Sequence, residues 1–151
     1  MPDPDAVRAA ALRDLDPVVL YGLLRLRVDA FVVEQACPYP ELDGRDVEPD
    51  ALHLWVEADG APAACLRLLE DPDGSARIGR VVTAPAHRGR GLSAALVRAA
   101  LARVPGRRVV LDAQAHLEGW YAGFGFAADG PGFLEDGSPH VPMARRARGG
   151  G

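Results

Sequence analysis

The amino-acid sequence predicts a single domain of the α/β class, and two observations support this prediction. Apolar runs of strand length alternate along the chain with segments of helical periodicity. The chain has 151 residues, 48% of them hydrophobic and 25% charged, which is typical of one globular domain with a genuine core. We expect this domain to span residues 1–151, with residues 146–151 as a disordered tail.

The first predicted elements are a weak strand and a helix. Residues 7–12 carry the strand pattern. Asp16-Pro17 is typical of a helix start, because aspartate caps free N–H groups and proline fits the first turn. The apolar face that follows recurs at helical spacing and consists of Leu20, Leu23, Leu24, Val28 and Phe31.

The middle of the chain predicts three strands. Two of them, 54–58 and 62–69, meet at Asp59-Gly60, a dipeptide typical of tight hairpins. A Pro/Gly-rich turn at 71–74 then leads to the third strand, 76–83.

The remaining elements alternate between helix and strand. A helix that ends near Pro105-Gly106 follows the loop, and its predicted buried side consists of Leu92, Leu96, Ala99 and Ala100. It is followed by a strand at 108–111, a short helix at 117–124 and a closing hairpin within 126–145.

The most informative segment is residues 87–96, which joins the strand at 76–83 to the following helix. The first turn of a helix has unpaired N–H groups and a partial positive charge, so anions bind there. Gly89 and Gly91 let the backbone approach a ligand, and the guanidinium forks of Arg88 and Arg90 suit phosphate oxygens. The segment therefore predicts a site for a phosphorylated cofactor.

The same segment also allows a second interpretation, in which the cofactor is a dinucleotide. Residues 89–94 read G-x-G-x-x-A, one form of the dinucleotide fingerprint, and Asp112 ends a following apolar run where a ribose-binding acid would lie. However, residues 84–88 separate the strand from the first glycine, and too little chain follows Asp112 for a doubly wound sheet. An NAD-dependent oxidoreductase is therefore the less favoured interpretation.

Two segments resemble motifs of the GNAT acetyltransferases. Residues 88–93 fit the acyl-CoA loop Arg/Gln-x-x-Gly-x-Gly/Ala, with Ser93 in place of the final small residue. Residues 114–126 resemble the segment Asn-x-x-Ala-x-x-Leu-Tyr-x-x-x-Gly-Phe, with Gln114 at the Asn position and Leu117 at the Ala position. Three further segments, 31–39, 113–116 and 135–143, resemble the ElaA-like branch of this family.

The resemblance implies the GNAT fold: a mixed sheet of six or seven strands, splayed open between the fourth and fifth strands, with helices on both faces. It also implies that acetyl-CoA binds in the splay, with its pyrophosphate on the turn at 88–93 and its pantetheine along the strand before it. The cofactor-binding residues expected on this basis are Val81, Val82, Thr83, Arg88, Gly89, Arg90, Gly91, Leu92, Ser93 and Gln114.

The resemblance also implies catalytic residues. Tyr121 matches the family tyrosine that protonates the departing CoA sulfur, while a tyrosine that merely packs beside its aromatic neighbours is the structural alternative. The attacking amine has a pKa of about 10.4, so some group must take its proton. The candidates are Glu34, His116 and His140, with ordered water as a further alternative.

The acceptor amine is expected to be cationic before it reacts. Glu34, Asp43, Asp46 and His140 are therefore the predicted substrate-binding residues. The two aspartates belong to an irregular, acid-rich loop at 38–49. Either this loop folds over the cleft as an attracting rim, or it is a solvated acidic surface.

These observations predict an acetyl-CoA-dependent N-acetyltransferase that acts on a small-molecule or protein amine. The alternative is a non-catalytic module that binds acyl-CoA. The net charge of −4 disfavours nucleic acid as a partner. The sequence shows no signal peptide, membrane-spanning run or metal-ligand spacing, so we expect a cytoplasmic monomer or homodimer without metal.

Overall fold

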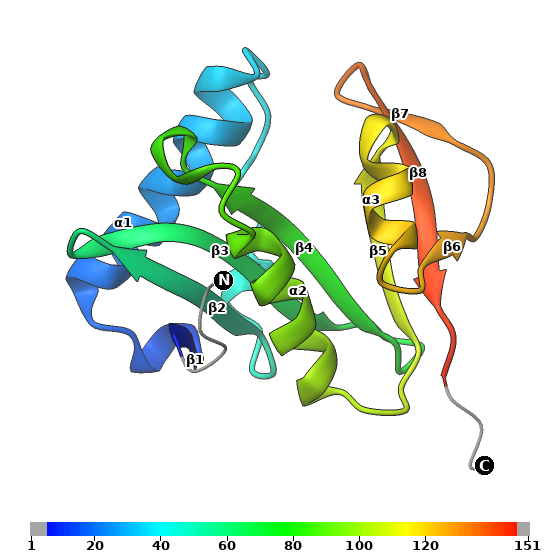
Figure 1. The fold of residues 1–151 in the computed structure, drawn as a ribbon, viewed down its shortest axis with the longest axis horizontal. Coiled ribbons are helices and arrows are strands. Elements are labelled where there is room, and N and C mark those ends of the chain that lie inside the picture. Colours follow the sequence, from blue (N-terminus) through cyan, green and yellow to red (C-terminus); the bar gives the residue numbers. More distant parts are fainter. Residues whose placement is uncertain (1–5, 148–151) are drawn as a thin grey trace.

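The protein is described from residue 6 to residue 147 by a computed structural model in which helices flank a mixed sheet (Figure 1). The helices are α1 (Pro17–Val28), which continues into the π-helix Asp29–Glu34, α2 (Leu92–Arg103) and α3 (Glu118–Ala122). The strands are β1 (Val7–Ala10), β2 (Leu52–Ala58), β3 (Ala61–Glu70), β4 (Ala76–Thr83), β5 (Val109–Gln114), β6 (Ala127–Ala128), β7 (Phe133–Glu135) and β8 (Ser138–Arg145).

The sheet has eight strands in the order β1-β2-β3-β4-β5-β8-β6, with β7 paired to β8. The sequence predicts six or seven strands, with a single closing hairpin, whereas the closing segment forms three strands. The pair β4–β5 is parallel, and all other strand pairs within residues 6–147 are antiparallel. A doubly wound parallel sheet of the dinucleotide-binding kind is therefore excluded for this part of the chain.

The predicted splay between the fourth and fifth strands is confirmed. β4 pairs with β5 only at Ala76↔Val109 and Arg77↔Val110, although β4 is eight residues long. Figure 1 shows the two strands side by side at one end and diverging toward the other. From residue 78 onward, β4 therefore presents an edge that no neighbouring strand covers.

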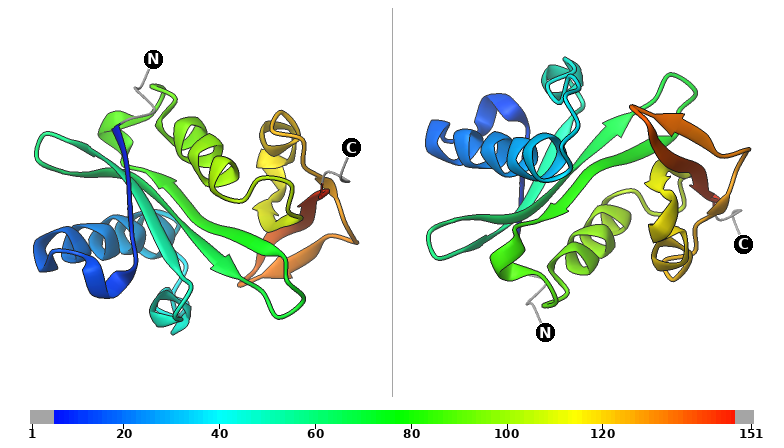
Figure 2. Two further views of the ribbon diagram at one scale, coloured as in Figure 1. Left: turned by 90° about the horizontal axis from the view of Figure 1, so that it is seen from below. Right: turned by 90° about the horizontal axis from the view of Figure 1, so that it is seen from above.

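Helices cover both faces of the sheet, as expected. Figure 2 shows α1 on one face and α2 with α3 on the other. The main core lies under α2, where side chains such as Leu54, Leu66, Ile78 and Leu96 are almost fully buried. A smaller core joins α1 to the opposite face of β2 and β3.

Local chemistry explains the best-predicted boundaries. The Asp16 carboxylate accepts a hydrogen bond of 2.8 Å from the Val18 N–H, a cap that stabilises the start of α1 by about 1 kcal/mol. Asp59 and Gly60 both have positive φ, 53° and 80°, as a tight hairpin turn requires. The apolar face of α1 is less regular than predicted, because Leu23 and Leu26 are buried together with the charged Arg27.

Within residues 6–147, no helix combines the length and the apolar character that crossing a bilayer requires. Most of the tail predicted at residues 146–151 lies outside the described residues.

Candidate active site

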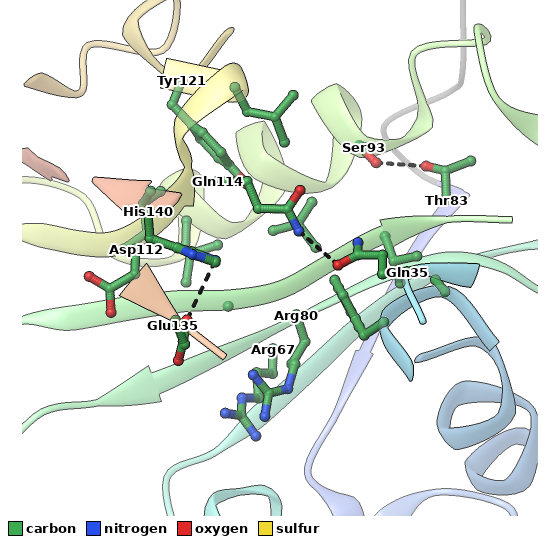
Figure 3. A pocket seen from close by; sticks show the side chains of 18 of the residues that line it. Gln35, Arg67, Arg80, Thr83, Ser93, Asp112, Gln114, Tyr121, Glu135 and His140 are labelled. Carbon is green, nitrogen blue, oxygen red and sulfur yellow. Dashed lines mark hydrogen bonds and ion pairs between the residues drawn. The ribbon is translucent and has the colours of Figure 1, made fainter. Parts of the chain in front are cut away.

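The opening between β4 and β5 leads into a cavity of about 1480 Å³ (Figure 3). One wall consists of β4 from residue 78 to 83, the end of the π-helix and the loop after it. The opposite wall consists of the end of β5, α3 and the β7–β8 turn, and the start of α2 closes one end. Every predicted site residue lines this cavity except Arg90 and Asp46.

The loop between β4 and α2 has the geometry that suits an anion. Gly89 and Gly91 have φ values of 81° and 75°, a conformation that favours glycine. Gly91 caps α2 without a side-chain hydrogen bond to its first turn. A Cβ atom on Gly89 would meet no other atom within 4 Å, so the space beside this glycine is open. The N–H groups of the first turn of α2 can therefore reach a bound phosphate.

The two loop arginines have different positions. Arg88 donates from Nη2 to Glu34 at 2.6 Å and from Nε to the Thr83 carbonyl at 3.1 Å. This hydrogen bond from Arg88 holds the pKa of Glu34 below its usual value. Arg90 is exposed, and its guanidinium lies 3.4 Å from His87 Nδ1, outside the cavity wall. Ser93, the departure from the family motif, lies 2.6 Å from the Thr83 hydroxyl.

A β-bulge interrupts β4 where it lines the cavity. The register passes from Cys65↔Val82 to Arg67↔Gly79, so two residues of β4, Arg80 and Val81, lie opposite one residue of β3. Arg80 has a φ of 53°, in the left-handed region that bulges of this kind usually fill with glycine. An arginine there costs about 1–2 kcal/mol of backbone strain.

Buried ion pairs join this bulge to the 38–49 loop. Arg80 Nε lies 2.7 Å from the Glu41 carboxylate, and Arg80 Nη2 donates to the Glu41 carbonyl at 3.0 Å. Glu41 is only 3% exposed and also accepts from Arg27 at 2.8 Å and from the Tyr39 hydroxyl at 2.5 Å. We call the whole group of three arginines and three carboxylates the arginine–carboxylate cluster: Arg27, Arg67, Arg80, Glu41, Asp43 and Asp46.

The two aspartates predicted to bind substrate belong to this cluster. Asp43 lines the cavity, and both of its oxygens accept hydrogen bonds from Arg67, at 2.8 and 2.6 Å. Asp46 is 6% exposed and does not line the cavity, because Arg27 binds both of its oxygens, at 2.7 and 3.1 Å. The sequence allowed two positions for this loop: a rim that attracts the cationic acceptor, or a solvated acidic surface. Asp46 takes neither position.

Ion pairing also determines the protonation of these aspartates. Burial alone would raise the pKa of Asp43, but the hydrogen bonds from Arg67 and from the Arg45 N–H lower it well below its usual range. Burial likewise opposes the ionised form of Asp46, and its hydrogen bonds to Arg27 again bring the net pKa down. Both carboxylates therefore stay charged at neutral pH and are already paired.

Tyr121 extends from α3 into the cavity toward Gln114 (Figure 3). The residue is 6% exposed, and its ring packs edge-on against Trp120 at 4.8 Å and Phe126 at 6.1 Å between centroids. Burial raises the pKa of Tyr121 to about 12, so its hydroxyl carries a proton at neutral pH. It can therefore act as a proton donor.

His140 lies on β8, and each of its ring nitrogens faces an oxygen atom. Its Nδ1 is 2.8 Å from the Ser138 carbonyl oxygen, and because a carbonyl only accepts, Nδ1 carries the hydrogen. In the neutral ring Nε2 is then the acceptor, and it lies 3.4 Å from the Glu135 carboxylate. The ring also stacks on Phe133 at 5.8 Å between centroids.

The other predicted residues lie at the rim. His116 is exposed in the short turn Ala115–Leu117, and it lines the cavity. The Gln114 amide donates to Gln35 at 3.4 Å, a contact that crosses the cleft from the end of β5 to the end of the π-helix (Figure 3).

A coenzyme A thioester fits this arrangement. The loop before α2 suits its phosphates, the uncovered edge of β4 suits the amides of its pantetheine, and Tyr121 supplies a proton donor from the opposite wall. Within residues 6–147, no three His, Cys, Asp or Glu side chains come together as a candidate metal site.

Sequence analysis did not single out Arg67, Arg80 or Glu135. A signal for the first two was present, because each places a charge in a strand whose other residues are mostly apolar. Carboxylates to pair with them are concentrated in the 38–49 loop. Glu135 had no comparable signal, since its relation to His140 arises only when β7 pairs with β8.

Comparison with known proteins agrees with this geometry. A family model for the acetyltransferase (GNAT) domain matches residues 24–147. A UPF0039 protein of Mycobacterium tuberculosis is 50% identical over 149 residues, 96% of each chain. The crystal structure of an acyl-CoA N-acyltransferase from Pseudomonas aeruginosa has a TM-score of 0.86 and 44% identity, covering 92% of this chain and 97% of that one. Escherichia coli ElaA has a TM-score of 0.84 and 36% identity, covering 93% and 98%. The chain therefore belongs to the GNAT family of acyl-CoA-dependent N-acyltransferases, in its ElaA-like branch.

Proposed function

We propose that this protein transfers an acetyl group from acetyl-CoA to a primary amine of a small molecule or a protein. The observation that carries the proposal is the position of Tyr121. This buried, protonated side chain lies on the wall opposite the uncovered, bulged edge of β4, with the anion-binding loop at the end of the same cavity.

Binding is assigned to the loop and to β4. Backbone N–H groups at residues 88–93 and the Arg88 guanidinium hold the pyrophosphate. The edge of β4 at Val81–Thr83 hydrogen-bonds the pantetheine as a neighbouring strand would. Gln114 contributes an amide from the opposite wall. Acetyl-CoA supplies the activated acyl group and a thiolate leaving group.

Proton removal from the amine is assigned to His140. Neutralising an amine with a pKa of about 10.4 costs about 4–5 kcal/mol at pH 7, so the reaction needs a base close to the amine. His140 Nε2 can accept the proton, and Glu135 then stabilises the imidazolium. Glu34 is a weaker candidate, because its pairing with Arg88 lowers its pKa. His116 and ordered water remain the other candidates.

The amine then attacks the thioester carbonyl, and backbone N–H groups at the β4 bulge stabilise the negative charge that develops on the oxygen. When the C–S bond breaks, Tyr121 donates its proton to the departing sulfur. The nitrogen of the tetrahedral intermediate and the His140 imidazolium each release a proton to solvent, and the phenolate takes one up. The net products are therefore an amide, free coenzyme A and one proton.

The test is Tyr121→Phe, assayed by thiol release from acetyl-CoA with a panel of amines. We expect kcat to fall about 100-fold, because Phe has no proton to donate, while the Kd for CoA changes less than about twofold. Tyr21→Phe, on an exposed position of α1, is the matched control. Reactions without amine correct for hydrolysis.

Two results would contradict the proposal. If Tyr121→Phe turned over like the wild type, Tyr121 would not be the acid. If CoA bound but no amine in the panel supported thiol release above hydrolysis, the non-catalytic acyl-CoA-binding module would be favoured instead.

A further inference from the structure

The residue at the β4 bulge is unusual for its backbone conformation. Arg80 occupies the left-handed position, with a φ of 53°, where glycine would fit without strain. Glycine would adopt this conformation with less backbone strain. The chain has a glycine directly before it, at position 79, but an arginine at position 80. This arrangement suggests that the side chain of Arg80 does something that glycine cannot.

That side chain is held by a hydrogen bond from Nη2 and by the charge attraction between its guanidinium and Glu41. Nε lies 2.7 Å from the Glu41 carboxylate, Nη2 donates to the Glu41 carbonyl, and the guanidinium lies over the Tyr39 ring, 5.5 Å from its centroid. Glu41 is itself held by Arg27 and Tyr39 in a buried position. Arg80 is therefore anchored mainly to the buried Glu41, with a longer contact of 3.4 Å from Nη2 to the Asp43 carboxylate.

The bulge lies where the proposed reaction needs accurate geometry. It comes after Arg77, the last residue of β4 that pairs with β5, and Gly79, Arg80 and Val81 all line the cavity. A bulge re-aims the N–H groups around it, so the backbone conformation of Arg80 decides which direction they face.

We propose that Arg80 is a positioning residue, whose ion pair with Glu41 holds the β4 bulge so that its N–H groups face the acyl carbonyl. This inference rests on the proposed function. It also gives the arginine–carboxylate cluster a role in the reaction, because the cluster links the 38–49 loop to the acyl-binding strand.

The experiment measures recognition of the carbonyl itself, without an acceptor amine. Calorimetry gives the Kd for acetyl-CoA and for S-ethyl-CoA, which replaces the carbonyl with a methylene. We expect the wild type to prefer acetyl-CoA about fivefold, the equivalent of one ordinary hydrogen bond. Arg80→Gly keeps the backbone conformation accessible but removes the ion pair, and we expect it to lose this preference while binding S-ethyl-CoA as before.

Asp59→Gly is the matched control. Asp59 has the same φ of 53° but lies in the β2–β3 hairpin turn, outside the cavity wall. Relieving backbone strain there should leave the preference for acetyl-CoA unchanged. A loss in Asp59→Gly comparable to that in Arg80→Gly would mean that strain relief, not the ion pair, causes the effect, and would overturn the inference.

Glu41→Gln tests whether Arg80 acts through its ion pair or by touching the ligand directly. The same variant replaces Arg80→Gly if that protein does not fold. It leaves Arg80 in place but removes the charge of its partner. We expect the same loss of carbonyl preference. Retention of the preference in Glu41→Gln would show that the ion pair is not needed, and retention in Arg80→Gly would show that the side chain is not needed. Either result overturns the inference.

Different results would contradict the proposed function and the role of Arg80. If the wild type binds neither thioester nor thioether, the proposed function itself is wrong. If it binds both equally, the N–H groups of the bulge do not select the carbonyl and only the further inference is lost.

Discussion

At the scale of single residues, the pair Arg88–Glu34 connects the loop proposed to bind the phosphates with the wall proposed to face the acceptor. Arg88 belongs to the anion-binding loop, and Glu34 ends the π-helix in the wall expected to face the acceptor. Their contact of 2.6 Å is made between side chains that are 47% and 40% exposed. A phosphate that approaches Arg88 must compete with this carboxylate, which also repels it.

Glu34→Gln should therefore tighten CoA binding, on the order of twofold to fivefold at low salt, because exposed ion pairs are weak. Calorimetry measures the effect, and it should shrink at high salt. Glu70→Gln is a close control, since Glu70 pairs with Arg107 at 2.5 Å with a similar exposure of 39%. Weaker CoA binding in Glu34→Gln would indicate that Glu34 orients Arg88 for the phosphate instead of competing with it.

At the scale of elements, the 38–49 loop is fixed by charge and not by apolar packing. Its Glu41 and Asp46 are buried where arginines meet them. Arg27 on α1 pairs with both, Arg80 on β4 also pairs with Glu41, and Arg67 on β3 also pairs with Asp46. Breaking such a pair leaves one buried charge without a partner, which is more costly than losing a surface ion pair.

Acid should weaken the attachment of this loop. The folded-state pKa of Asp43 lies below its unfolded value of 3.8, so the stability it contributes is present above that pH and is lost as the pH falls further. Asp43→Asn should cost about 2 kcal/mol at pH 7. The free energy of unfolding of this variant should also fall less steeply with decreasing pH in the acid limb of its pH dependence, by up to about 1.4 kcal/mol per pH unit.

Urea unfolding between pH 7 and pH 2.5 measures both effects. The exposed Asp50, just before β2, provides the control Asp50→Asn. An acid limb equally steep in wild type and Asp43→Asn would mean that other groups dominate acid unfolding.

The same loop shows where sequence reasoning reaches its limit. The Asp59-Gly60 hairpin, the Asp16 cap and the glycine loop before α2 were predictable, because each depends on residues adjacent in the chain. The partners of Asp43 and Asp46 lie far away in sequence, on β3 and α1, and become neighbours only after folding. Periodicity also predicted one continuous helix through Phe31, whereas the chain changes to a π-helix at Asp29 and thereby brings Glu34 to the cavity.

At the scale of the whole molecule, the sheet consists of two halves that share little pairing. β1–β4 form one half and β5–β8 the other, and their strands pair only at Ala76 and Arg77 of β4. The cavity lies between the halves and takes residues from both. A ligand in the cavity therefore contacts both halves at once and should stabilise the complete fold.

Coenzyme A at about 100 times its Kd should raise the stability by about 2.7 kcal/mol, because it binds the folded chain and not the unfolded one. For a chain of this size that corresponds to a rise in Tm of about 5–10 °C. Thermal unfolding with CoA and, separately, with NADH distinguishes the acyltransferase from the oxidoreductase that the motif at residues 89–94 also resembles. A rise with NADH but not with CoA would contradict the proposed function.

Hydrogen exchange shows where CoA binds. The N–H groups of β4 after Arg77 should gain protection with CoA, because no strand covers that edge in the free protein.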